Sequence, residues 1–241
     1  MSRTTSKPIS SSATTKSLPT ITNGTSGRTT RYWDCCLPSC SWKENTGGSF
    51  VRPCFADGVT PIPDFSYIYG SGCTGGKGYL CNSNQPWALN ENIAFGFSAA
   101  SFTQGTQKEW CCSCYRIQFT SGNVKGKQMI VQIVNTGYDL SSNHFDLQIP
   151  GGGVGVFNGC ESQWNSDPNG WGQRYGGVSS IDQCNSLPEQ LRDGCKWRFE
   201  WFKGSDNPDI VFERVQCPKE LTDKTGCIPL DNAKQKPIPW I

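Results

Sequence analysis

Two aspartates in this sequence have unusual neighbours. Asp34 lies in "TTRYWDCC", directly after two aromatic residues and directly before two cysteines. Asp146 lies in "NHFDLQIPGGGVG", between Phe145 and Leu147. Apolar neighbours raise the pKa of a carboxyl group by desolvation, so that the group stays protonated near neutral pH and can donate a proton. Cleavage of a glycosidic bond uses two such carboxyl groups, one as a protonated acid and one as an ionised base or nucleophile.

Each aspartate also has a simpler structural interpretation. Asp146 is equally consistent with a turn residue before a strand, and Asp34 with an N-cap or a hydrogen-bonding residue in a disulfide loop. From local context alone, the structural interpretation is favoured for both.

The composition excludes several other chemistries. His144 is the only histidine, which rules out a three-histidine metal site and leaves one candidate for a Ser-His-Asp triad. Neither a G-x-S-x-G elbow nor a G-x-G-x-x-G loop is present. The "CCSC" run at 111–114 lacks the regular paired spacing of a zinc ribbon, so no metal or cofactor is expected. A net charge of +2 predicts no nucleic-acid partner, and no apolar run reaches the roughly 18 residues of a membrane span.

The cysteines indicate an oxidising compartment. There are 14 of them, an even number, all between Cys35 and Cys227, and they predict up to seven disulfides in a secreted protein. Adjacent cysteines bond to each other only with strain, so Cys35–Cys36 and Cys111–Cys112 should each connect to two different places. No signal peptide follows Met1, and the sequence is interpreted as a mature form.

The chain divides into two parts by composition. Residues 1–28 are Ser/Thr-rich, without aromatic residues or cysteines, and are predicted to be a disordered or glycosylated linker; Asn23 begins the only N-glycosylation sequon. Residues 29–241 are predicted to form one all-β domain, a small barrel with long, disulfide-clamped loops and a few short helices. Strands are expected within 110–122, 127–137, 196–204 and 209–217, and short helices within 179–186, 187–194 and 217–226.

Aromatic residues are numerous, with 9 Trp, 7 Tyr and 12 Phe. Aromatic rings stack on the C–H faces of sugars, so aromatic loop residues are expected to line an open polysaccharide groove. The tryptophans in Gly-, Pro- and Cys-rich loops are Trp33, Trp42, Trp87, Trp164 and Trp171. Trp197 and Trp201 follow a strand-like alternation and are predicted to lie in the core.

Several motifs, in order along the chain, resemble those of glycoside hydrolase family 45. They are "TTRYWDCCLPSCSW" (29–42), "NQPWALN" (84–90), "WCCSCY" (110–115), "SNHFDLQIPGGGVGVFNGC" (142–160), "GQRYGGVSS" (172–180), "WRFEWFK" (197–203) and "NPDIVFERVQCP" (207–218). The resemblance extends from about residue 29 to about residue 227 and includes all 14 cysteines.

The resemblance implies a six-stranded double-psi β-barrel and a secreted, inverting endo-β-1,4-glucanase. It implies Asp34 as general base, Asp146 as general acid and Asp139 as a supporting carboxylate in a mobile loop over the cleft. Inversion places the two catalytic carboxyl groups roughly 6.5–9.5 Å apart, with room for a water molecule. The resemblance further implies sugar contacts for Thr30, Tyr32 and Trp42, and a role for His144 in orienting the loop over the cleft.

The implied partners are cellulose and cello-oligosaccharides, bound by a monomer. Residues 1–28 suggest a cellulose-binding module upstream in a longer protein. Two positions depart from the family pattern: Leu37 replaces a lysine whose contact is lost or passes to Lys43, and Tyr138 replaces a glycine beside Asp139.

Two non-catalytic alternatives use a similar barrel. Expansin-like wall-loosening proteins keep an "HFD"-type aspartate but lack the "YWD" aspartate, which is present here as Asp34. Barwin-like carbohydrate-binding modules are shorter and lack the region around 160–205.

Overall fold

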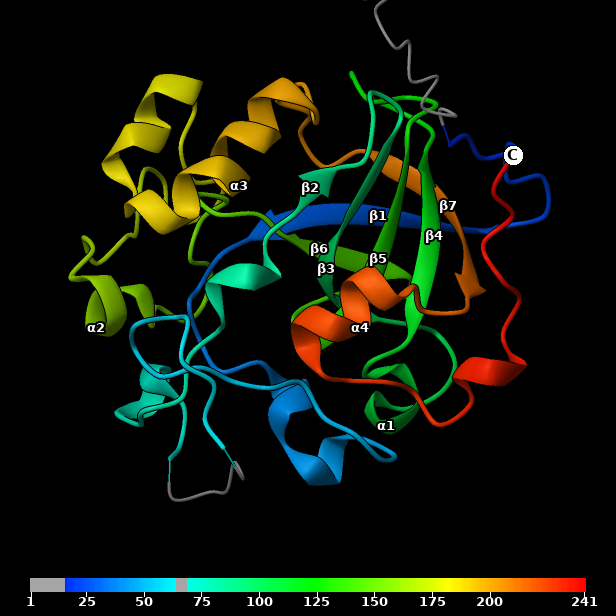
Figure 1. The fold of residues 1–241 in the computed structure, drawn as a ribbon. Coiled ribbons are helices and arrows are strands. Elements are labelled where there is room, and N and C mark those ends of the chain that lie inside the picture. The colour runs from blue at the N-terminus through cyan, green and yellow to red at the C-terminus, as the bar shows by residue number, and fades with distance from the viewer. Residues whose placement is uncertain (1–15, 64–68) are drawn as a thin grey trace, which may run out of the picture.

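The strands that build the domain are long and largely apolar, and six of them close into a barrel. The computed structural model describes residues 16–63 and 69–241 (Figure 1). The barrel strands are β1 (Thr25–Tyr32), β3 (Ile93–Ser101), β4 (Cys114–Phe119), β5 (Gln128–Thr136), β6 (His144–Gln148) and β7 (Asp209–Val215). Their order is β3-β5-β4-β7-β1-β6, and an antiparallel β3–β6 pairing closes the ring. The short strand β2 (Trp87–Ala88) pairs with β3 outside the ring. This architecture confirms the predicted all-β barrel.

The barrel interior is filled by side chains rather than by a channel. Eight of the nine residues of β3 are buried, as expected for a strand covered on both faces. Phe145 of β6 packs edge-on against Phe212 of β7, with ring centroids 4.9 Å apart. Aromatic rings in this arrangement contribute both buried area and a favourable ring–ring geometry. The strands that carry the site are therefore held in place by a tightly packed barrel interior.

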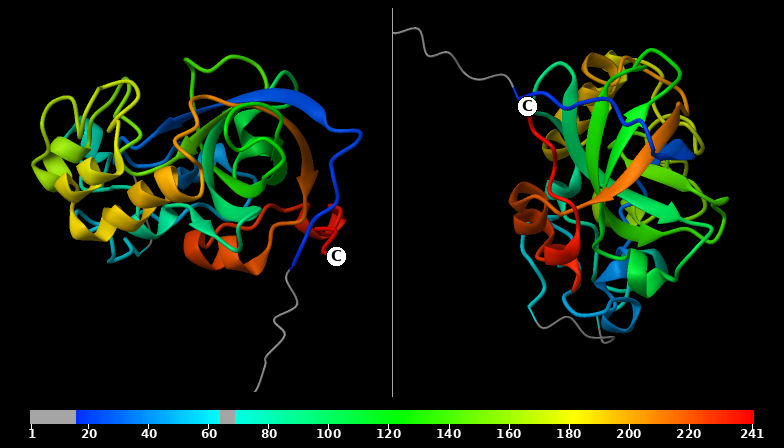
Figure 2. Two further views of the ribbon diagram at one scale, coloured as in Figure 1. Left: turned by 90° about the horizontal axis from the view of Figure 1, so that it is seen from above. Right: turned by 90° about the vertical axis from the view of Figure 1, so that its right-hand side faces the viewer.

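Short helices cover the outside of the barrel and the loops. The α-helices are α1 (Gln107–Trp110), α2 (Cys160–Trp164), α3 (Glu189–Glu200) and α4 (Lys219–Thr225). The 3-10 helices are η1 (Ser39–Ser41), η2 (Lys43–Asn45), η3 (Gly72–Thr74), η4 (Asn82–Asn84), η5 (Ile181–Ser186) and η6 (Asn232–Lys234). Helices α2 and α3 lie together at one side of the barrel (Figures 1 and 2). Within the described residues, no helix is long and apolar enough to cross a membrane.

The strand predicted at 196–204 is wrong, because most of that segment belongs to α3. Trp197 and Trp201 stack face to face, with centroids 5.1 Å apart and planes 13° apart. Residues four apart lie on the same face of a helix, so the pattern that resembled a strand also satisfies a helical face. The prediction that both tryptophans are core residues is confirmed, since each is 5% exposed. The helix predicted at 217–226 is confirmed as α4, which ends at Gly226 in the left-handed conformation.

Seven disulfides use all the cysteines, as predicted. They are Cys35–Cys160, Cys36–Cys73, Cys40–Cys111, Cys54–Cys81, Cys112–Cys227, Cys114–Cys217 and Cys184–Cys195. Each adjacent pair connects to two different places, which confirms that expectation. The loops around the site are therefore held mainly by covalent bonds.

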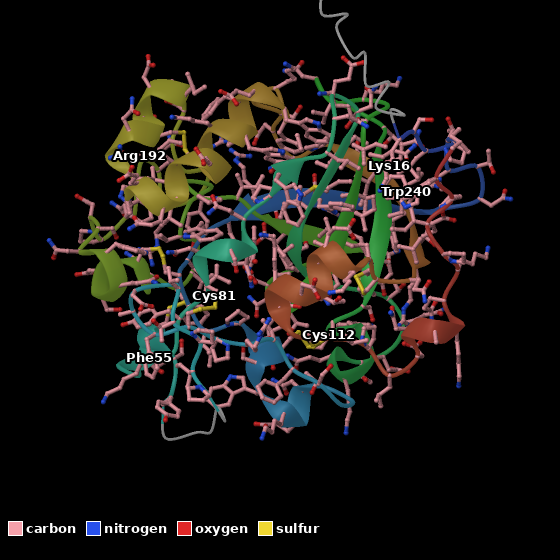
Figure 3. The ribbon with its side chains drawn as sticks, in the orientation of Figure 1. Lys16, Phe55, Cys81, Cys112, Arg192 and Trp240 are labelled. Carbon is pink, nitrogen blue, oxygen red and sulfur yellow. A yellow bond between two sulfur atoms is a disulfide. The ribbon has the colours of Figure 1, made fainter. Side chains whose placement is uncertain are left out.

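The packed part of the chain begins before residue 29. Strand β1 starts at Thr25, Ile21 is 8% exposed, and the Ser17 backbone exchanges two hydrogen bonds with Ile241 at 2.9 and 3.0 Å. The ammonium group of Lys16 lies 4.9 Å from the centre of the Trp240 ring, so the first described residues lie beside the C-terminus (Figures 2 and 3). The prediction of a linker ending at residue 28 is therefore wrong for residues 16–28. Residues 1–15 lie outside the described residues, and there the linker stays a prediction.

Candidate active site

One long cleft runs across the ends of β1 and β6. It consists of two adjoining hollows of about 460 and 420 Å³. Both hollows share the same floor and rim, formed by Tyr32, Asp139, Leu140, Asp146 and Gly155. The first hollow also contains Asp34 and Trp42, and the second contains Thr30 and His144. All seven predicted site residues therefore line the cleft. Asp34 and Trp42 line only the first hollow, Thr30 and His144 only the second, and Tyr32, Asp139 and Asp146 line both.

Asp146 is placed by a strand pairing between distant parts of the chain. Strands β1 and β6 run parallel, with Thr30 opposite Asp146 and Arg28 opposite His144. The Thr30 hydroxyl donates a 2.5 Å hydrogen bond to Asp146 Oδ1. Burial raises the pKa of Asp146 to about 7; the Thr30 hydrogen bond opposes this rise, and the charges of Asp139 and Asp34 add to it. A carboxyl group with this pKa is available as a proton donor near neutral pH.

Asp34 lies just beyond β1, where two disulfides hold the chain. Its Oδ1 accepts a 2.9 Å hydrogen bond from the Cys36 backbone N–H, and its carbonyl oxygen accepts one of 2.7 Å from Gly159. Cys35, between Asp34 and Cys36, has a φ of 61°, a left-handed conformation that is costly for a residue with a Cβ. The Cys35–Cys160 bond ties this residue to the start of α2. Asp34 is 9% exposed, and burial raises its pKa to about 7.

Gly159 is required by the close approach of these segments. A Cβ at this position would lie 2.8 Å from Cys73 Sγ and 3.2 Å from the Asp34 carbonyl oxygen. Both distances are too short for an unstrained contact with backbone and a disulfide that cannot move away. The glycine therefore allows the 159–160 segment to press directly against the Asp34 backbone.

The hydrogen-bond partners distinguish the two carboxyl groups. A backbone N–H, such as that of Cys36, can only donate, so it favours the ionised form of Asp34. The hydroxyl of Thr30 can donate or accept, so it can serve Asp146 in either protonation state. This difference is consistent with Asp34 as base and Asp146 as acid.

Tyr32 lies near both aspartates and is buried, with 8% exposure. Its hydroxyl oxygen accepts hydrogen bonds from Gln148 Nε2 at 2.9 Å and Asn135 Nδ2 at 3.2 Å. Burial, together with the nearby charges of Asp34 and Asp146, raises the pKa of Tyr32 well above 10.0, so the phenol stays protonated. Asn135 and Gln148 are site residues that sequence reasoning missed, because nothing local marks a strand residue that faces a distant tyrosine.

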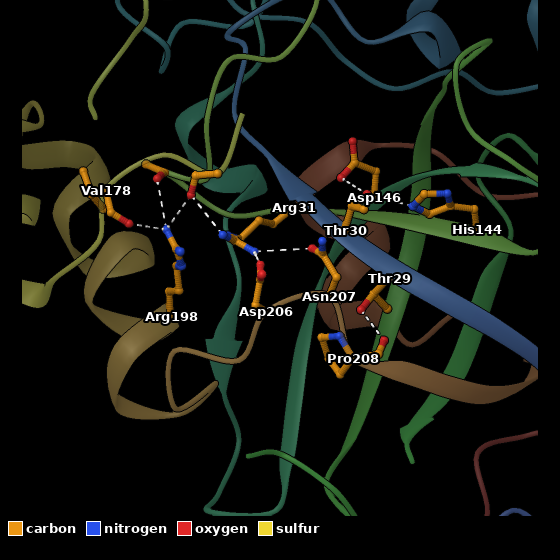
Figure 4. A network of polar contacts seen from close by, with 12 residues as sticks. Thr29, Thr30, Arg31, His144, Asp146, Val178, Arg198, Asp206, Asn207 and Pro208 are labelled. Atoms are coloured by element: carbon orange, nitrogen blue, oxygen red, sulfur yellow. Dashed lines mark hydrogen bonds and ion pairs between the residues drawn. The ribbon is translucent and has the colours of Figure 1, made fainter. Parts of the chain in front are cut away.

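His144 and Thr30 lie directly beside Asp146 (Figure 4). His144 Nε2 and Thr30 Oγ1 are hydrogen-bonded at 2.8 Å, and His144 Nδ1 is 3.3 Å from the Ser141 hydroxyl. Burial, with Arg28 nearby, lowers the pKa of His144 below 6.5, so the imidazole is neutral at neutral pH. The predicted link between His144 and the loop over the cleft has a physical basis in the Ser141 contact. Whether Thr30 touches the sugar stays a prediction.

Asp139 lies in the loop between β5 and β6, here called the lid loop (137–143). Asp139 and the neighbouring Tyr138 are both exposed, and Tyr138 has 100% exposure. Asp139 lines both hollows, and its charge raises the pKa of Asp146.

Most of the aromatic loop residues do not line the cleft. Trp42 lies on the wall of the first hollow, as predicted. Trp33 is 2% exposed, and Trp87, Trp164 and Trp171 pack against core clusters. The exposed aromatic residues of the cleft are instead Tyr138, Phe157 and Tyr175. The "VGVFNGC" and "GQRYGG" motifs carry the last two, and an aromatic residue among glycines was a signal that could have identified them.

Polar groups that line the second hollow form a further network with Arg198 (Figure 4). Arg31 forms an ion pair with Asp206 at 2.5 Å and donates a 3.1 Å hydrogen bond to the Gly176 carbonyl. Arg198, 5% exposed, also donates to the Gly176 carbonyl, at 3.1 Å. These contacts tie the turn that carries Gly176 to β1 and α3.

At Leu37, one of the two positions that depart from the family pattern, Lys43 does not take the place of the missing lysine. Leu37 is 6% exposed and packs in a small apolar cluster with Ile62 at the cleft wall. Lys43 places its ammonium group 5.2 Å from the centre of the Phe50 ring and is not among the described residues that line the cleft.

The described residues contain no group of three or more His, Cys, Asp or Glu side chains that could hold a metal ion.

A β-barrel whose cleft holds two carboxyl groups with pKa values raised by desolvation, one buried and one half-buried, and has aromatic residues on its rim, has the site of a glycoside hydrolase. A model of glycosyl hydrolase family 45 matches residues 26–228. The chain belongs to this family and is a hydrolase of the cellulase type.

Individual relatives agree with this assignment. An endoglucanase from Cryptopygus antarcticus is 53% identical over 209 residues, which cover 86% of this chain and 91% of that protein. An endoglucanase from Phaedon cochleariae is 46% identical over 205 residues, which cover 83% of each protein. The crystal structure of a cellulase from the Antarctic springtail Cryptopygus antarcticus has 53% identity and a TM-score of 0.81, over 87% of this chain and 99% of that one.

Proposed function

We propose that this chain is a secreted endo-β-1,4-glucanase that cuts internal bonds of cellulose with inversion, with Asp146 as general acid and Asp34 as general base. Asp146 gives a proton to the leaving glycosidic oxygen while Asp34 takes a proton from the attacking water. The observation that carries the proposal is that one cleft contains both carboxyl groups, Asp34 buried and Asp146 half-buried, each with its pKa raised to about 7 by desolvation. The endoglucanases among its relatives support the substrate class.

Further parts of the proposal rest on the shape of the site. The cleft continues on both sides of Tyr32 and Asp146, which suits an internal stretch of a polysaccharide better than a chain end. Tyr32 and Trp42 contact sugar units, and Asp139 supports the protonation of Asp146.

The seven disulfides support an extracellular location. The protein acts as a monomer, and any upstream cellulose-binding module belongs to a longer protein.

An NMR time course on a short cello-oligosaccharide tests the mechanism. We expect the first new reducing ends to be α-anomers, because inversion of a β-bond releases the α-form. Asp146→Asn and Asp34→Ala should each leave oligosaccharide binding intact and reduce turnover, for Asp146→Asn by about 10²–10⁴-fold. β-Anomers as the first product would show retention and overturn both assigned roles. A wild-type protein that binds cellulose without releasing sugars would be a non-catalytic, expansin-like binder.

A further inference from the structure

The general acid is connected to the exposed lid loop by three consecutive hydrogen bonds. Asp146 Oδ1 accepts from Thr30 at 2.5 Å, and Thr30 Oγ1 meets His144 Nε2 at 2.8 Å. His144 Nδ1 then meets the Ser141 hydroxyl at 3.3 Å. Figure 4 shows Thr30 bonded on one side to Asp146 and on the other to His144. Every group in this series except the carboxyl can donate at one position and accept at another, so the direction of the series can reverse.

We propose that Ser141, His144 and Thr30 form a proton relay that returns a proton to Asp146 after each turnover, and that the imidazole of His144 changes tautomer as it does so. The inference rests on the proposed role of Asp146 as general acid. These three are positioning residues for Asp146, not groups that touch the reacting atoms.

The proton count can be followed along the series. While Asp146 is ionised, Thr30 donates to its Oδ1, His144 Nε2–H donates to Thr30, and Nδ1 accepts from Ser141. A proton from water then enters at Ser141, which passes its own proton to Nδ1. His144 passes the Nε2 proton to Thr30, and Thr30 passes its proton to Asp146 Oδ1. Ser141 and Thr30 each lose and gain one proton, the ring exchanges Nε2–H for Nδ1–H, and Asp146 gains one proton from the solvent. Before the relay runs again, Nδ1 returns its proton to water through Ser141, and Nε2 takes one from water in the open hollow that His144 lines, so that the ring is again the Nε2–H tautomer.

The position of the relay explains why an indirect route is useful. A bound polysaccharide fills the cleft that Asp146 lines, and so blocks direct contact between the carboxyl group and water. Ser141 is exposed and is not among the described residues that line either hollow of the cleft, and His144 also lines an adjoining open hollow of about 550 Å³. Ser142 and Asn143 line that hollow as well. The relay therefore meets water at Ser141, outside the residues that line the two hollows of the cleft.

Burial, aided by the charge of Arg28, keeps the imidazole neutral. Burial and Arg28 lower the pKa of His144, and Asp139 opposes them. The charged groups near the relay are Arg28 and Arg31 on β1, Asp34 after β1, Asp139 in the lid loop and Asp209 at the start of β7. Strand β3, on the other edge of β6, places uncharged Ala99 and Ser101 opposite Asp146 and His144. A neutral imidazole has one donor and one acceptor nitrogen, which a proton relay requires.

The single histidine makes the test unambiguous. In protein labelled with ¹⁵N at histidine, only the ring nitrogens of His144 give signals, and ¹³C-labelled aspartate reports the carboxyl of Asp146, assigned by its loss in Asp146→Asn. As pH falls through the titration of Asp146, we expect the two ring nitrogens to exchange their protonated and unprotonated shifts with the same midpoint. A ring that keeps one tautomer while the Asp146 carbon titrates would overturn the relay.

Paired variants separate the relay from a merely structural role. Thr30→Val should uncouple the tautomer of His144 from Asp146, and Thr30→Ser, which keeps the hydroxyl, should restore the coupling. Ser141→Ala should weaken the coupling, whereas Ser142→Ala should leave it unchanged; both residues are exposed, so neither change threatens folding. Equal effects of the two serine variants would count against the relay. Because these readouts need no substrate, their failure is distinct from a failure of wild-type protein to hydrolyse cellulose.

Discussion

Replacing Asp34 by asparagine should stabilise the fold, and the gain should increase with pH. Asp34 is 9% exposed, and burial alone accounts for the rise of its pKa, against the opposing hydrogen bond from Cys36. Asparagine has nearly the same shape and still offers an oxygen to the Cys36 N–H. The substitution therefore removes a buried charge without removing its hydrogen bond.

The size and sign of the effect follow from the pKa. The folded-state pKa of Asp34 is about 7, against an ordinary value of 3.8. Below 3.8 both states carry a protonated carboxyl, so the aspartate costs the fold nothing there. Between the two values the unfolded chain ionises while the folded protein keeps its proton, so stability falls as pH rises. Above about 7 the full cost remains, roughly 4 kcal/mol at about 1.4 kcal/mol for each pH unit.

Urea unfolding of wild-type protein and Asp34→Asn, at several pH values with the disulfides intact, measures this cost. The stability difference should be near zero below the ordinary pKa of aspartate and should reach a few kcal/mol in favour of the variant above neutral pH. Asp57→Asn is a control of opposite sign, because hydrogen bonds from Thr60 and Val59 lower the pKa of this exposed carboxyl. A difference for Asp34→Asn that is flat with pH, or that favours wild-type protein at high pH, would refute the reasoning.

Three further predictions concern activity and packing. The pH profile of kcat should be bell-shaped around neutral pH, and Asp139→Asn should move its alkaline limb to lower pH, because the charge of Asp139 raises the pKa of Asp146; an unmoved limb would exclude that role. Tyr138→Gly should raise KM for long cello-oligosaccharides about 2- to 10-fold with little change in kcat, while Tyr138→Phe should keep the wild-type KM. Gly159→Ala should destabilise the protein by about 1–3 kcal/mol in urea unfolding, because its Cβ meets a disulfide sulfur at 2.8 Å; Gly47→Ala, whose nearest neighbour is a flexible leucine side chain, should cost less.

The sequence predicted the elements whose pattern is local. Strands β4, β5 and β7 were expected from alternating or continuous apolar runs, and helix α4 from its proline and glycine ends. Two elements show the limit of this approach. Helix α3 was predicted in part as a strand, because Trp197 and Trp201 satisfy both periodicities and only packing between the barrel and the loops selects one. Strand β3 was not predicted, because its Gly- and Ala-containing sequence has no alternation when both faces are buried.

The candidate site was predicted better than its surroundings. Asp34 and Asp146 were identified from their neighbours and from the family motifs, and both line the cleft. Trp33, by contrast, was expected among the loop tryptophans of the groove and is buried. A loop tryptophan has the same local sequence whether it faces substrate or covers a second small core, so the choice between the two depends on the folded neighbours.

The sequence by itself determined which groups are candidates for the chemistry and that disulfides hold the loops. A single histidine, an even number of cysteines and two aspartates among apolar residues leave few alternatives, because composition limits which reactions and which cross-links are available. Only the tertiary structure decided how these groups cooperate. The parallel register of β1 and β6 brings Thr30 beside Asp146, 116 residues away, and joins both to His144. Burial by distant segments then raises the pKa of both aspartates, and desolvation is a property of the folded surroundings that no local sequence contains.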